Sequence, residues 1–431
     1  MLKILISAYA CEPNKGSEPE VGWKIANTLG TLGHKVYVIT RSNNKENIEN
    51  YLKYKKAKNI TFLYFDLPKW IIKILRKKKN SYSYLYIYLW HIFIFFYARN
   101  IISQVKFNLI HHVTFASLRF PNLLSIYKIP FVFGPVTGGD VVPFHLRKSF
   151  PLSEKIKEYL RDLSNKYIKF SPLLNLTFHN SYLIIVNNNE TKKLIPKKYH
   201  YKVKECLAIG VDKKNSIIKK TRKFNKFFQI CYVGNLIPIK GLDILFKTFL
   251  KLIKNNHNIR LNIIGKGPLK LKLITEAEKL GINKYIRWIG QVNRKKLEFF
   301  YKKNDLLIMP SLRDSGGFVI LEAMNNGLPV AILNIGGPAK IVDNSCGIKI
   351  NVKDLTLEQI VNNLSNKISY LIKNPKIYES KVKKSLLKVK NFYWSKKVNF
   401  IYKNFKINEI KNKKNSIISS ITRTHTRCFS C

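Results

Sequence analysis

Short runs of mostly apolar residues recur along the chain and are separated by longer amphipathic stretches. Runs of this length that are rich in Ile, Leu, Val and Phe are typical of buried strands. In the first half of the chain they are residues 3–8, 35–40, 60–65, 109–112, 131–133 and 182–186. In the second half they are residues 228–233, 261–264, 285–289, 305–309, 329–333 and 347–350.

The stretches between these strands predict helices. Residues 21–32 have an amphipathic pattern between the first two strands. In the second half, apolar residues recur at helical spacing at Leu242, Leu245, Phe246, Phe249, Leu252 and Ile253. Strands that alternate with helices favour parallel sheets with right-handed crossovers. Because the pattern runs twice, we predict two doubly wound α/β domains with a ligand cleft between the carboxyl ends of their strands.

Length and composition agree with two domains. The chain has 431 residues, about twice what one hydrophobic core supports, and 46% of them are apolar. The basic and weakly periodic residues 210–226 are the predicted linker between a first domain, residues 1–209, and a second domain, residues 227–390. Residues 408–431 have no core pattern and are predicted to be a disordered basic tail.

The formal net charge is +52. Such a charge attracts anions, whether nucleic acid, acidic lipid or a phosphorylated substrate. The basic residues are mostly lysines spread along the chain among many Ile and Asn residues, as a biased codon composition would also produce. No nucleic-acid recognition module is found, and Lys rather than Arg dominates. Charge alone therefore does not identify the partner.

The six cysteines are scattered, which favours a reducing compartment over a disulfide framework. Cys428 and Cys431 have the spacing of a CxxC pair, but we interpret this as chance because no second pair accompanies it. The first apolar run, residues 4–6, is too short for a signal peptide. We expect the protein to stay in the cytoplasm.

One uncharged, aromatic stretch, residues 82–98, follows four basic residues at 76–79. At about 1.5 Å per residue a helix of this length barely crosses a bilayer, and His91 with five tyrosines makes it a poor lipid-facing span. The alternatives are a helix buried in the first domain and an element lying in the membrane interface. We favour burial with peripheral membrane contact.

The loop after the first strand, residues 12–20, is the first candidate site. Ser17 and Glu20 fit a capping box, and Gly16 stands just before the cap, where backbone can approach a ligand. A helix start presents unpaired N–H groups to an anion. The simpler interpretation is a well-capped turn.

The equivalent turn of the second half, residues 233–241, carries Lys240 just before a helix. There its ammonium could meet a diphosphate as a point charge, although a solvated lysine is the simpler interpretation in a lysine-rich chain.

The strongest local pattern is residues 310–324, where a strand ends and two glycines open a helix. The backbone of Gly316 and Gly317 can approach a phosphate, and Glu322 can accept hydrogen bonds from ribose hydroxyls. Asp314 could hold sugar hydroxyls. The alternative is two unrelated acids, but acids are scarce in this chain.

Several segments together resemble a retaining GT-B glycosyltransferase of family 4. They are EPNKGSEPEVGW, HHVTFASLRFP followed by FGPVTGG, VGNLIPIKGLD, and DSGGFVILEAMNNGLPV with its two acids separated by seven residues. The resemblance runs from about residue 2 to residue 405. It includes FYWSKKVNFIYKNF, which is similar to a helix that crosses back to the first domain, here residues 391–407. It implies the GT-B fold, an α/β fold of two Rossmann-like doubly wound domains facing across a cleft.

The resemblance also implies a role for individual residues of the first domain. Gly16 and Ser17 match the loop that faces the donor diphosphate. His112 matches a histidine beside the reacting centre, although a histidine at a strand end is more often structural and His111 stands next to it.

In the second domain the resemblance implies a set of donor-binding residues. These are Asn235, Lys240, Gly316, Gly317, Phe318 and Glu322. Lys240 would neutralise the diphosphate and Asp314 would lie near the donor sugar, so both join His112 as catalytic candidates. The family usually has Arg at the position of Asn235 and Glu at that of Asp314, which puts donor affinity and donor identity in question.

The implied activity is the transfer of a hexose-type unit, with retention of configuration, from a UDP- or GDP-linked sugar. The acceptor would be a glycan or a lipid-linked molecule at an anionic membrane surface, in the synthesis of cell-surface polysaccharide such as lipopolysaccharide. No metal, other cofactor or nucleic-acid partner is expected, and the chain has no DxD-type motif placed for donor binding. The alternatives are another GT-B enzyme, such as a phosphorylase or nucleotide-sugar epimerase, and a basic nucleic-acid-binding protein.

Overall fold

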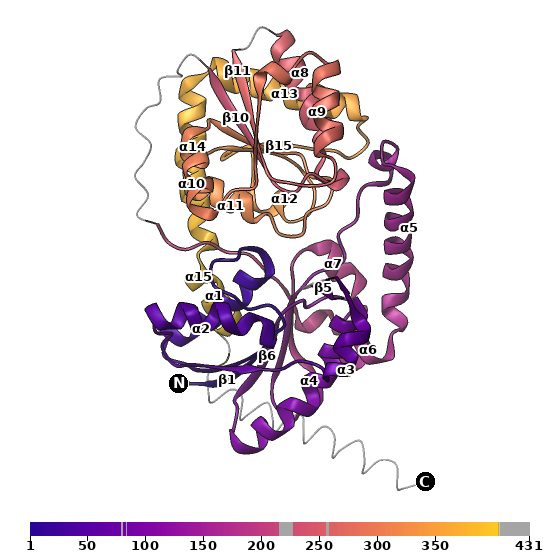
Figure 1. Cartoon of the computed structure of the whole chain (residues 1–431), viewed down its shortest axis with the longest axis vertical. Coiled ribbons are helices and arrows are strands. Elements are labelled where there is room, and N and C mark those ends of the chain that lie inside the picture. The colour runs from indigo at the N-terminus through magenta and orange to yellow at the C-terminus, as the bar shows by residue number, and fades with distance from the viewer. Residues whose placement is uncertain (79–80, 83, 215–226, 256–257, 404, 406–431) are drawn as a thin grey trace.

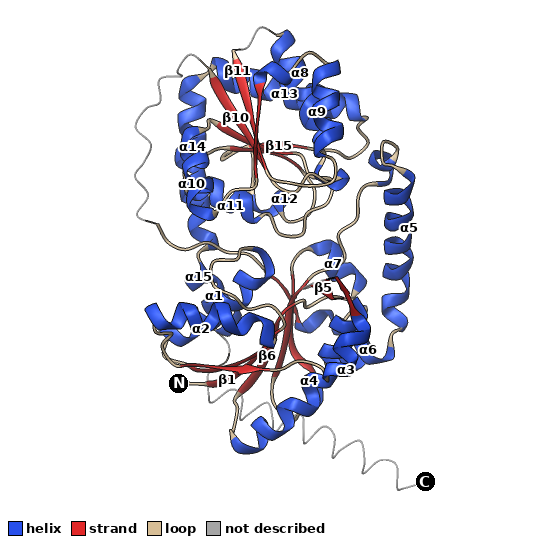
Figure 2. Cartoon of the chain, viewed as in Figure 1, coloured by secondary structure: helices blue, strands red, loops and turns tan. Residues whose placement is uncertain are grey.

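Two lobes, each built on one parallel sheet with helices on both faces, make up the computed structural model of the chain (Figures 1 and 2). The structure describes residues 1–78, 81–82, 84–214, 227–255, 258–403 and 405. Each lobe has one cluster of buried apolar side chains on either face of its sheet. The predicted α/β fold class, two doubly wound domains facing across a cleft, is confirmed.

The first sheet has the strand order β3-β2-β1-β6-β7-β8-β9. Its strands pair in parallel, as where Ile4 lies beside Val36 and Leu109. The bounds are β1 Lys3–Ala8, β2 Lys35–Thr40, β3 Ile60–Tyr64, β6 Leu109–Thr114, β7 Phe131–Val136, β8 Ser181–Val186 and β9 Val203–Glu205. The short β9, at the edge of the sheet, has no apolar run and was not predicted. A small antiparallel pair, β4 Arg76–Lys78 and β5 Ser81–Tyr82, stands apart.

The second sheet has the order β12-β11-β10-β13-β14-β15 and is also parallel throughout. Its strands are β10 Phe228–Val233, β11 Ile259–Ile264, β12 Ile286–Gly290, β13 Leu306–Met309, β14 Val330–Leu333 and β15 Ile348–Ile350. All twelve strands predicted in the two halves are present, most with ends shifted by one or two residues.

The helices fill the intervals between strands. In the first lobe they are α1 Ser17–Thr31, α2 Lys45–Tyr54, α3 Lys69–Leu75, α4 Tyr84–Gln104, α5 Leu152–Tyr167, α6 Pro172–Asn180 and α7 Asn189–Leu194. In the second they are α8 Leu242–Lys254, α9 Lys270–Lys279, α10 Arg294–Lys303, α11 Phe318–Asn325, α12 Pro338–Ile341, α13 Leu357–Lys373 and α14 Pro375–Val389. The final helix is α15 Trp394–Tyr402.

Both sheets reverse their strand order at one point, between β1 and β6 and between β10 and β13. Open α/β sheets bind ligands beyond the carboxyl ends of their strands at such a switch point, because the loops there diverge. The candidate loops follow β1, β10 and β13, so the topology brings all three predicted sites to the switch points.

The chain crosses between the lobes more than once. Val142, Leu146 and Phe150 pack in the core of the second lobe, although β7 and α5 on either side of them belong to the first half of the chain. In return, α15 packs on the first lobe, where the Tyr402 hydroxyl lies 2.5 Å from His111 Nδ1. Of the predicted linker, residues 210–214 are described, and residues 215–226 lie outside the described part, as does the predicted tail.

The aromatic stretch 82–98 falls mostly in α4, which by length and composition could cross a membrane. One face of α4 packs in the core of the first lobe through Tyr86, Trp90 and Ile94. The Trp90 Nε1–H donates to the Phe65 carbonyl at 3.1 Å. The prediction that this stretch is buried therefore holds for that face of α4. Tyr84 and Phe96 are exposed.

Candidate functional site

A cavity of about 590 Å³ lies between the lobes at the carboxyl ends of both sheets. Loops after β1, β10 and β13 all contribute to its walls. The predicted residues that line it are Gly16, Ser17, Asn235, Lys240, Asp314, Gly316, Gly317, Phe318 and Glu322. The fold thus gathers residues from positions 16 to 322 around one space.

The first-lobe wall begins at Gly16, which is the N-cap of α1 and has a φ of 70°. No atom lies within 4 Å of the place that a Cβ would take on Gly16, so its backbone borders open space. Ser17 follows with a φ of 54°, a strained conformation for a residue other than glycine. The start of α1 therefore presents backbone to the cavity.

The predicted capping box of Ser17 and Glu20 is wrong. No side chain caps α1. Because Ser17 has a left-handed backbone and lies inside the helix rather than at its cap, it cannot fold back on the first turn as a capping serine does. Glu20 instead pairs with Arg294 of the second lobe. The absence of a cap leaves the N–H groups of this helix start without a side-chain acceptor.

Lys240 reaches Asp314 across the second-lobe wall, with 2.6 Å between Nζ and Oδ2. Backbone contacts fix this approach: the Leu312 N–H donates to the Ile239 carbonyl at 2.9 Å. Gly241 has a φ of 66° and packs closely against Pro310. A Cβ at this position would lie 2.1 Å from the Pro310 carbonyl oxygen, so only glycine fits. The pair is mostly shielded, with 17% and 13% of the side chains exposed. An anion in the cavity would compete with Asp314 for the ammonium.

The loop after β13 presents backbone at the start of α11. Gly317, the N-cap of this helix, has a φ of 89°, which favours glycine. The Gly316 N–H donates to Asp314 Oδ1 at 3.1 Å, and the Gly337 N–H holds the Asp314 carbonyl at 2.9 Å. Two helix starts, those of α1 and α11, thus border one cavity, and both place the positive end of a helix dipole there.

Glu322 lies in the second turn of α11 and is largely buried. Burial raises the pKa of its carboxyl group, and nearby Glu20 raises it further, whereas Arg294 and the hydrogen bond from Tyr301 act in the opposite direction. The Tyr301 hydroxyl donates to Oε2 at 3.1 Å. The cavity therefore holds a carboxyl group that protonates more readily than an exposed glutamate.

Arg294 is a cavity residue that the sequence analysis missed. It begins α10, lines the wall and contacts acids from both lobes. Its Nη1 donates to Glu20 Oε1 at 2.8 Å and Oε2 at 2.9 Å, and its Nη2 lies 3.3 Å from Glu322 Oε1. No local sequence motif indicates a role for this arginine. The only signal was the alternation of strands and helices, which places α10 before β13 and so near the cleft.

Asn235 stands on the cavity wall with its side chain exposed, and its carbonyl accepts from the Tyr232 hydroxyl at 2.9 Å. The second cation that the family usually has at this position is therefore absent from this part of the wall. The guanidinium of Arg294 lies elsewhere on the same wall.

His112 does not line the cavity. Its side chain is fully buried in β6, where Nδ1 lies 2.9 Å from Ser7 Oγ and the ring meets that of His91. Burial, followed by the neighbouring His91 and His111, lowers the pKa of His112 well below its usual value. The imidazole is enclosed in the core and does not border the cavity, so the role of His112 beside the reacting centre stays a prediction.

A second cavity of about 720 Å³ adjoins the first and shares Asn14, Arg294 and Glu322 with it. It extends along α10 to Asp212 and Lys214. Within the described part of the chain, no three His, Cys, Asp or Glu side chains gather as metal ligands would.

Comparison with known proteins gives the same picture of the second lobe. Residues 213–385 match the family model described as Glycosyl transferases group 1. The chain is 34% identical over 114 residues to the uncharacterized glycosyltransferase MJ1607 of Methanocaldococcus jannaschii, which is 26% of this chain and 29% of that protein. It is 28% identical over 232 residues to protein CapJ of Staphylococcus aureus, 48% of this chain and 57% of that protein. The matches thus span between about a third and somewhat over half of these relatives.

Solved structures resemble the whole chain. A crystal structure of Anabaena Alr3699/HepE in complex with UDP and glucose has a TM-score of 0.55 at 15% identity, covering 97% of this chain and all of that one. The apo form of the lipopolysaccharide outer core galactosyltransferase WaaB has a TM-score of 0.60 at 14% identity, with coverage of 97% and 100%. At such identities the likeness concerns the fold, which is GT-B.

Proposed function

Since the chain belongs, through residues 213–385, to the glycosyl transferases group 1 family (GT4), we propose that it is a retaining glycosyltransferase. It moves a hexose-type unit from a nucleoside diphosphate sugar, linked to UDP or GDP, to a glycan or lipid-linked acceptor. The product serves the synthesis of cell-surface polysaccharide. WaaB, a lipopolysaccharide outer core galactosyltransferase whose fold this chain resembles, supports this direction by its name alone.

One observation carries the proposal: a single cavity combines two helix N-termini, the ammonium of Lys240 and the carboxyl group of Glu322. A nucleoside diphosphate needs these partners, because its phosphates are anionic and its ribose donates hydrogen bonds. We assign the diphosphate to Gly16, Gly316, Gly317 and Lys240, and the ribose to Glu322. The HepE structure with UDP supports a nucleotide of this kind.

The chemistry follows from the charges. Breaking the bond between sugar and phosphate builds negative charge on the leaving diphosphate. Donors that already point at that position stabilise the charge without reorganising, and in a shielded cavity they do so strongly. The helix N-termini act in this way, and Lys240 adds its charge once the diphosphate has displaced Asp314 from its ammonium. Asp314 is then free to accept hydrogen bonds from hydroxyl groups of the donor sugar. The oxygen of the acceptor hydroxyl then bonds to the anomeric carbon on the face that the phosphate leaves, and its proton passes to the leaving phosphate.

We propose that the protein acts in the cytoplasm. Within the described residues, Cys11, Cys206 and Cys346 are free thiols, which supports a reducing compartment. The sugar nucleotide would reach the cleft from this side.

A panel of nucleotides tests the proposal. UDP or GDP should raise the thermal unfolding midpoint of the full chain, and short DNA should not. A screen of nucleoside diphosphate sugars for slow hydrolysis then identifies the donor. Stabilisation by DNA alone, with every sugar nucleotide left intact, would favour a basic nucleic-acid-binding protein instead.

A further inference from the structure

The helix α5 is inverted: the side chains that it buries are polar, and its large apolar side chains point to solvent. Its buried residues are Glu158 and Asn165. Large apolar side chains of the helix are exposed, namely Leu152 (74%), Ile156 (51%), Tyr159 (67%), Leu160 (56%), Leu163 (37%) and Tyr167 (62%). We call this set the α5 stripe. Its spacing of three, four and seven residues places it along one helical face.

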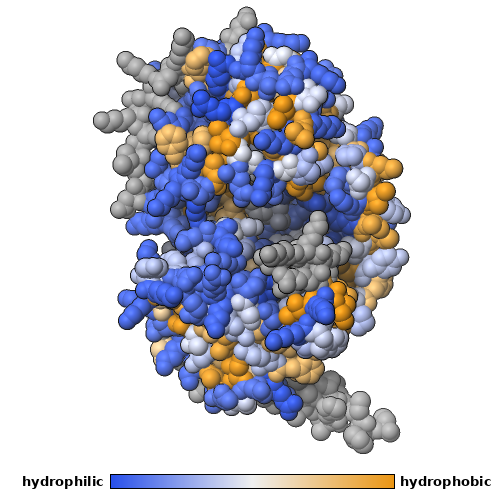
Figure 3. Space-filling view, in the orientation of Figure 1, coloured by the Kyte–Doolittle hydropathy of each residue, from blue (hydrophilic) through white to orange (hydrophobic). Residues whose placement is uncertain are grey.

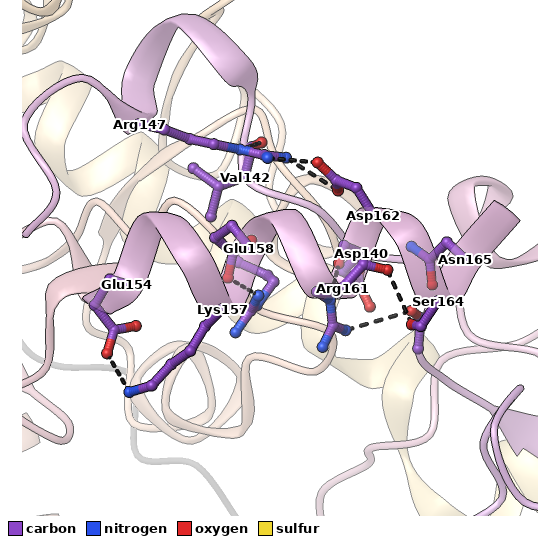
Figure 4. A network of polar contacts seen from close by, with 12 residues as sticks. Asp140, Val142, Arg147, Glu154, Lys157, Glu158, Arg161, Asp162, Ser164 and Asn165 are labelled. Atoms are coloured by element: carbon purple, nitrogen blue, oxygen red, sulfur yellow. Dashed lines mark hydrogen bonds and ion pairs between the residues drawn. The ribbon is translucent and has the colours of Figure 1, made fainter. Parts of the chain in front are cut away.

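The inward face of α5 is fixed by polar contacts, many of them drawn in Figure 4. Glu158 pairs with Arg313 of the second lobe. Arg147 pairs with Asp162 at 2.5 Å, and Arg161 Nε donates to the Asp140 carbonyl at 2.8 Å. These contacts set the rotation of the helix, because turning the stripe inward would break ion pairs and bury apolar groups among arginines. The exposed stripe is therefore held in place by the fold.

The stripe continues beyond the helix. Phe170, which follows α5, is 76% exposed, and Leu173 and Leu176 of α6 are each more than a third exposed. Figure 3 shows hydrophobic side chains along the edge of the molecule where Figure 1 draws α5. A continuous exposed apolar surface of this kind marks a site of contact with protein or membrane.

Basic residues border the stripe. Lys155 and Lys166 are exposed on α5, Lys148 precedes the helix and Lys169 follows it. Two acids of α5 are exposed or partly exposed, and both are paired with cations. Asp162 pairs with Arg147, and Glu154 pairs with Lys157 at 2.6 Å. Apolar side chains flanked by cations suit the surface of an anionic bilayer. The apolar side chains can enter the acyl region while the cations attract the anionic headgroups, so both contribute to binding.

A second copy of the chain fits this surface less well. Each copy carries a formal charge of +52, and a contact through α5 would bring two rows of lysines together. An anionic bilayer offers the opposite charge beside an apolar layer.

We propose that the α5 stripe docks the protein on an anionic lipid bilayer. The contact with Arg313 and a hydrogen bond between His145 Nε2 and the Val352 carbonyl, 3.0 Å apart, tie this region to both lobes. The bilayer then lies beside the lobes rather than against one end of the molecule. This docking does not depend on nucleotide binding, and it assigns lipid contact to α5 instead of the stretch 82–98.

The test is co-sedimentation of the full chain with vesicles of phosphatidylcholine containing about one third phosphatidylglycerol. The double variant Ile156→Ser, Leu160→Ser should lower the affinity more than about tenfold, since each lost side chain removes several buried carbon groups. Leu387→Ser in α14 is the control, because Leu387 is 60% exposed and α14 lies on the side of the second lobe away from α5 (Figure 1). It should bind like the parent chain.

A second readout locates the contact. Tyr159→Trp should add emission that shifts to shorter wavelength when these vesicles are present, whereas Tyr370→Trp, at a residue of α13 that is 58% exposed, should not. Equal sedimentation of the double variant and the parent would overturn the proposal, because the general positive charge would then suffice. Loss of a concentration-dependent dimer in the double variant, without vesicle binding by the parent, would also overturn it in favour of a second copy.

Discussion

Arg294 Nη1 donates to both carboxylate oxygens of Glu20, at 2.8 and 2.9 Å, and thereby joins the second lobe to the first across the cleft. Only 1% of the Glu20 side chain is exposed, so this carboxylate depends on the arginine for its charge partner. The same guanidinium faces Glu322, the proposed ribose acid. The approach of the lobes and the protonation of the nucleotide site are therefore linked through one side chain.

Replacing Arg294 should weaken nucleotide binding. Arg294→Ala leaves Glu20 and Glu322 close together without the guanidinium that pairs with both, which raises the pKa of Glu322 further and disfavours its ionised form. We expect the binding free energy of UDP to fall by about 1–3 kcal/mol, measured by titration calorimetry. Arg287→Ala, at an exposed arginine of β12, is the control and should bind normally. Undiminished UDP affinity in Arg294→Ala would remove this residue from the site.

Nucleotide affinity should depend on pH through Glu322. Burial raises the pKa of this carboxyl group, so its acceptor form is lost as the pH falls through a value above the ordinary glutamate range. As the pH is lowered, UDP affinity should therefore begin to fall at a higher pH than it would if the ribose were held by an exposed glutamate. In Glu322→Gln this step disappears, while the titration of UDP itself remains in both proteins. An identical pH profile for the two would exclude Glu322 as the titrating group.

Lys240→Ala and Glu322→Ala should each weaken UDP binding by about 1–3 kcal/mol, since each removes a charged hydrogen-bond partner. Lys247→Ala changes an exposed lysine of α8, the helix that follows Lys240, and should have no effect. If both site variants bind UDP like the parent chain, the nucleotide lies elsewhere.

Asn235→Arg should strengthen UDP binding, because it adds a further cation to the wall that Lys240 and Arg294 occupy. The gain should be about 1 kcal/mol, as the exposed position screens part of the attraction. It should also shrink as salt is added. A gain that persists unchanged in high salt would point to a cause other than charge.

His112→Ala should lower stability rather than the turnover of folded enzyme. The substitution empties a buried site and leaves Ser7 without its partner, at a cost of about 2–4 kcal/mol. The thermal midpoint should fall, while donor hydrolysis per folded molecule should stay near that of the parent. A large loss of turnover at an unchanged midpoint would restore the catalytic role that the resemblance implies.

The sequence predicted the sheets well because parallel strands buried on both faces are nearly continuous apolar runs. β1, β2 and β10 have the predicted bounds, and the loops after β1 and β10 hold predicted site residues. Edge strand β9 escaped notice because its sequence, Val-Lys-Glu, is mostly polar and its side chains are half-buried or exposed.

What the sequence could not supply were the contacts between distant segments. Ser17 and Glu20 have capping-box spacing, but an ion pair with Arg294, 274 residues away, determines where Glu20 points. The amphipathic pattern of α5 suggests an apolar face turned inward. Only the contacts of Glu158 and Arg161 with other segments reveal that it faces outward.

The most direct measurement is a crystal structure of the full chain soaked with UDP. We predict the diphosphate beside Lys240 and the backbone of Gly316 and Gly317, with the ribose hydroxyls on Glu322. UDP bound outside the space between the lobes, or no UDP at a concentration that stabilises the protein in solution, would contradict the proposed function.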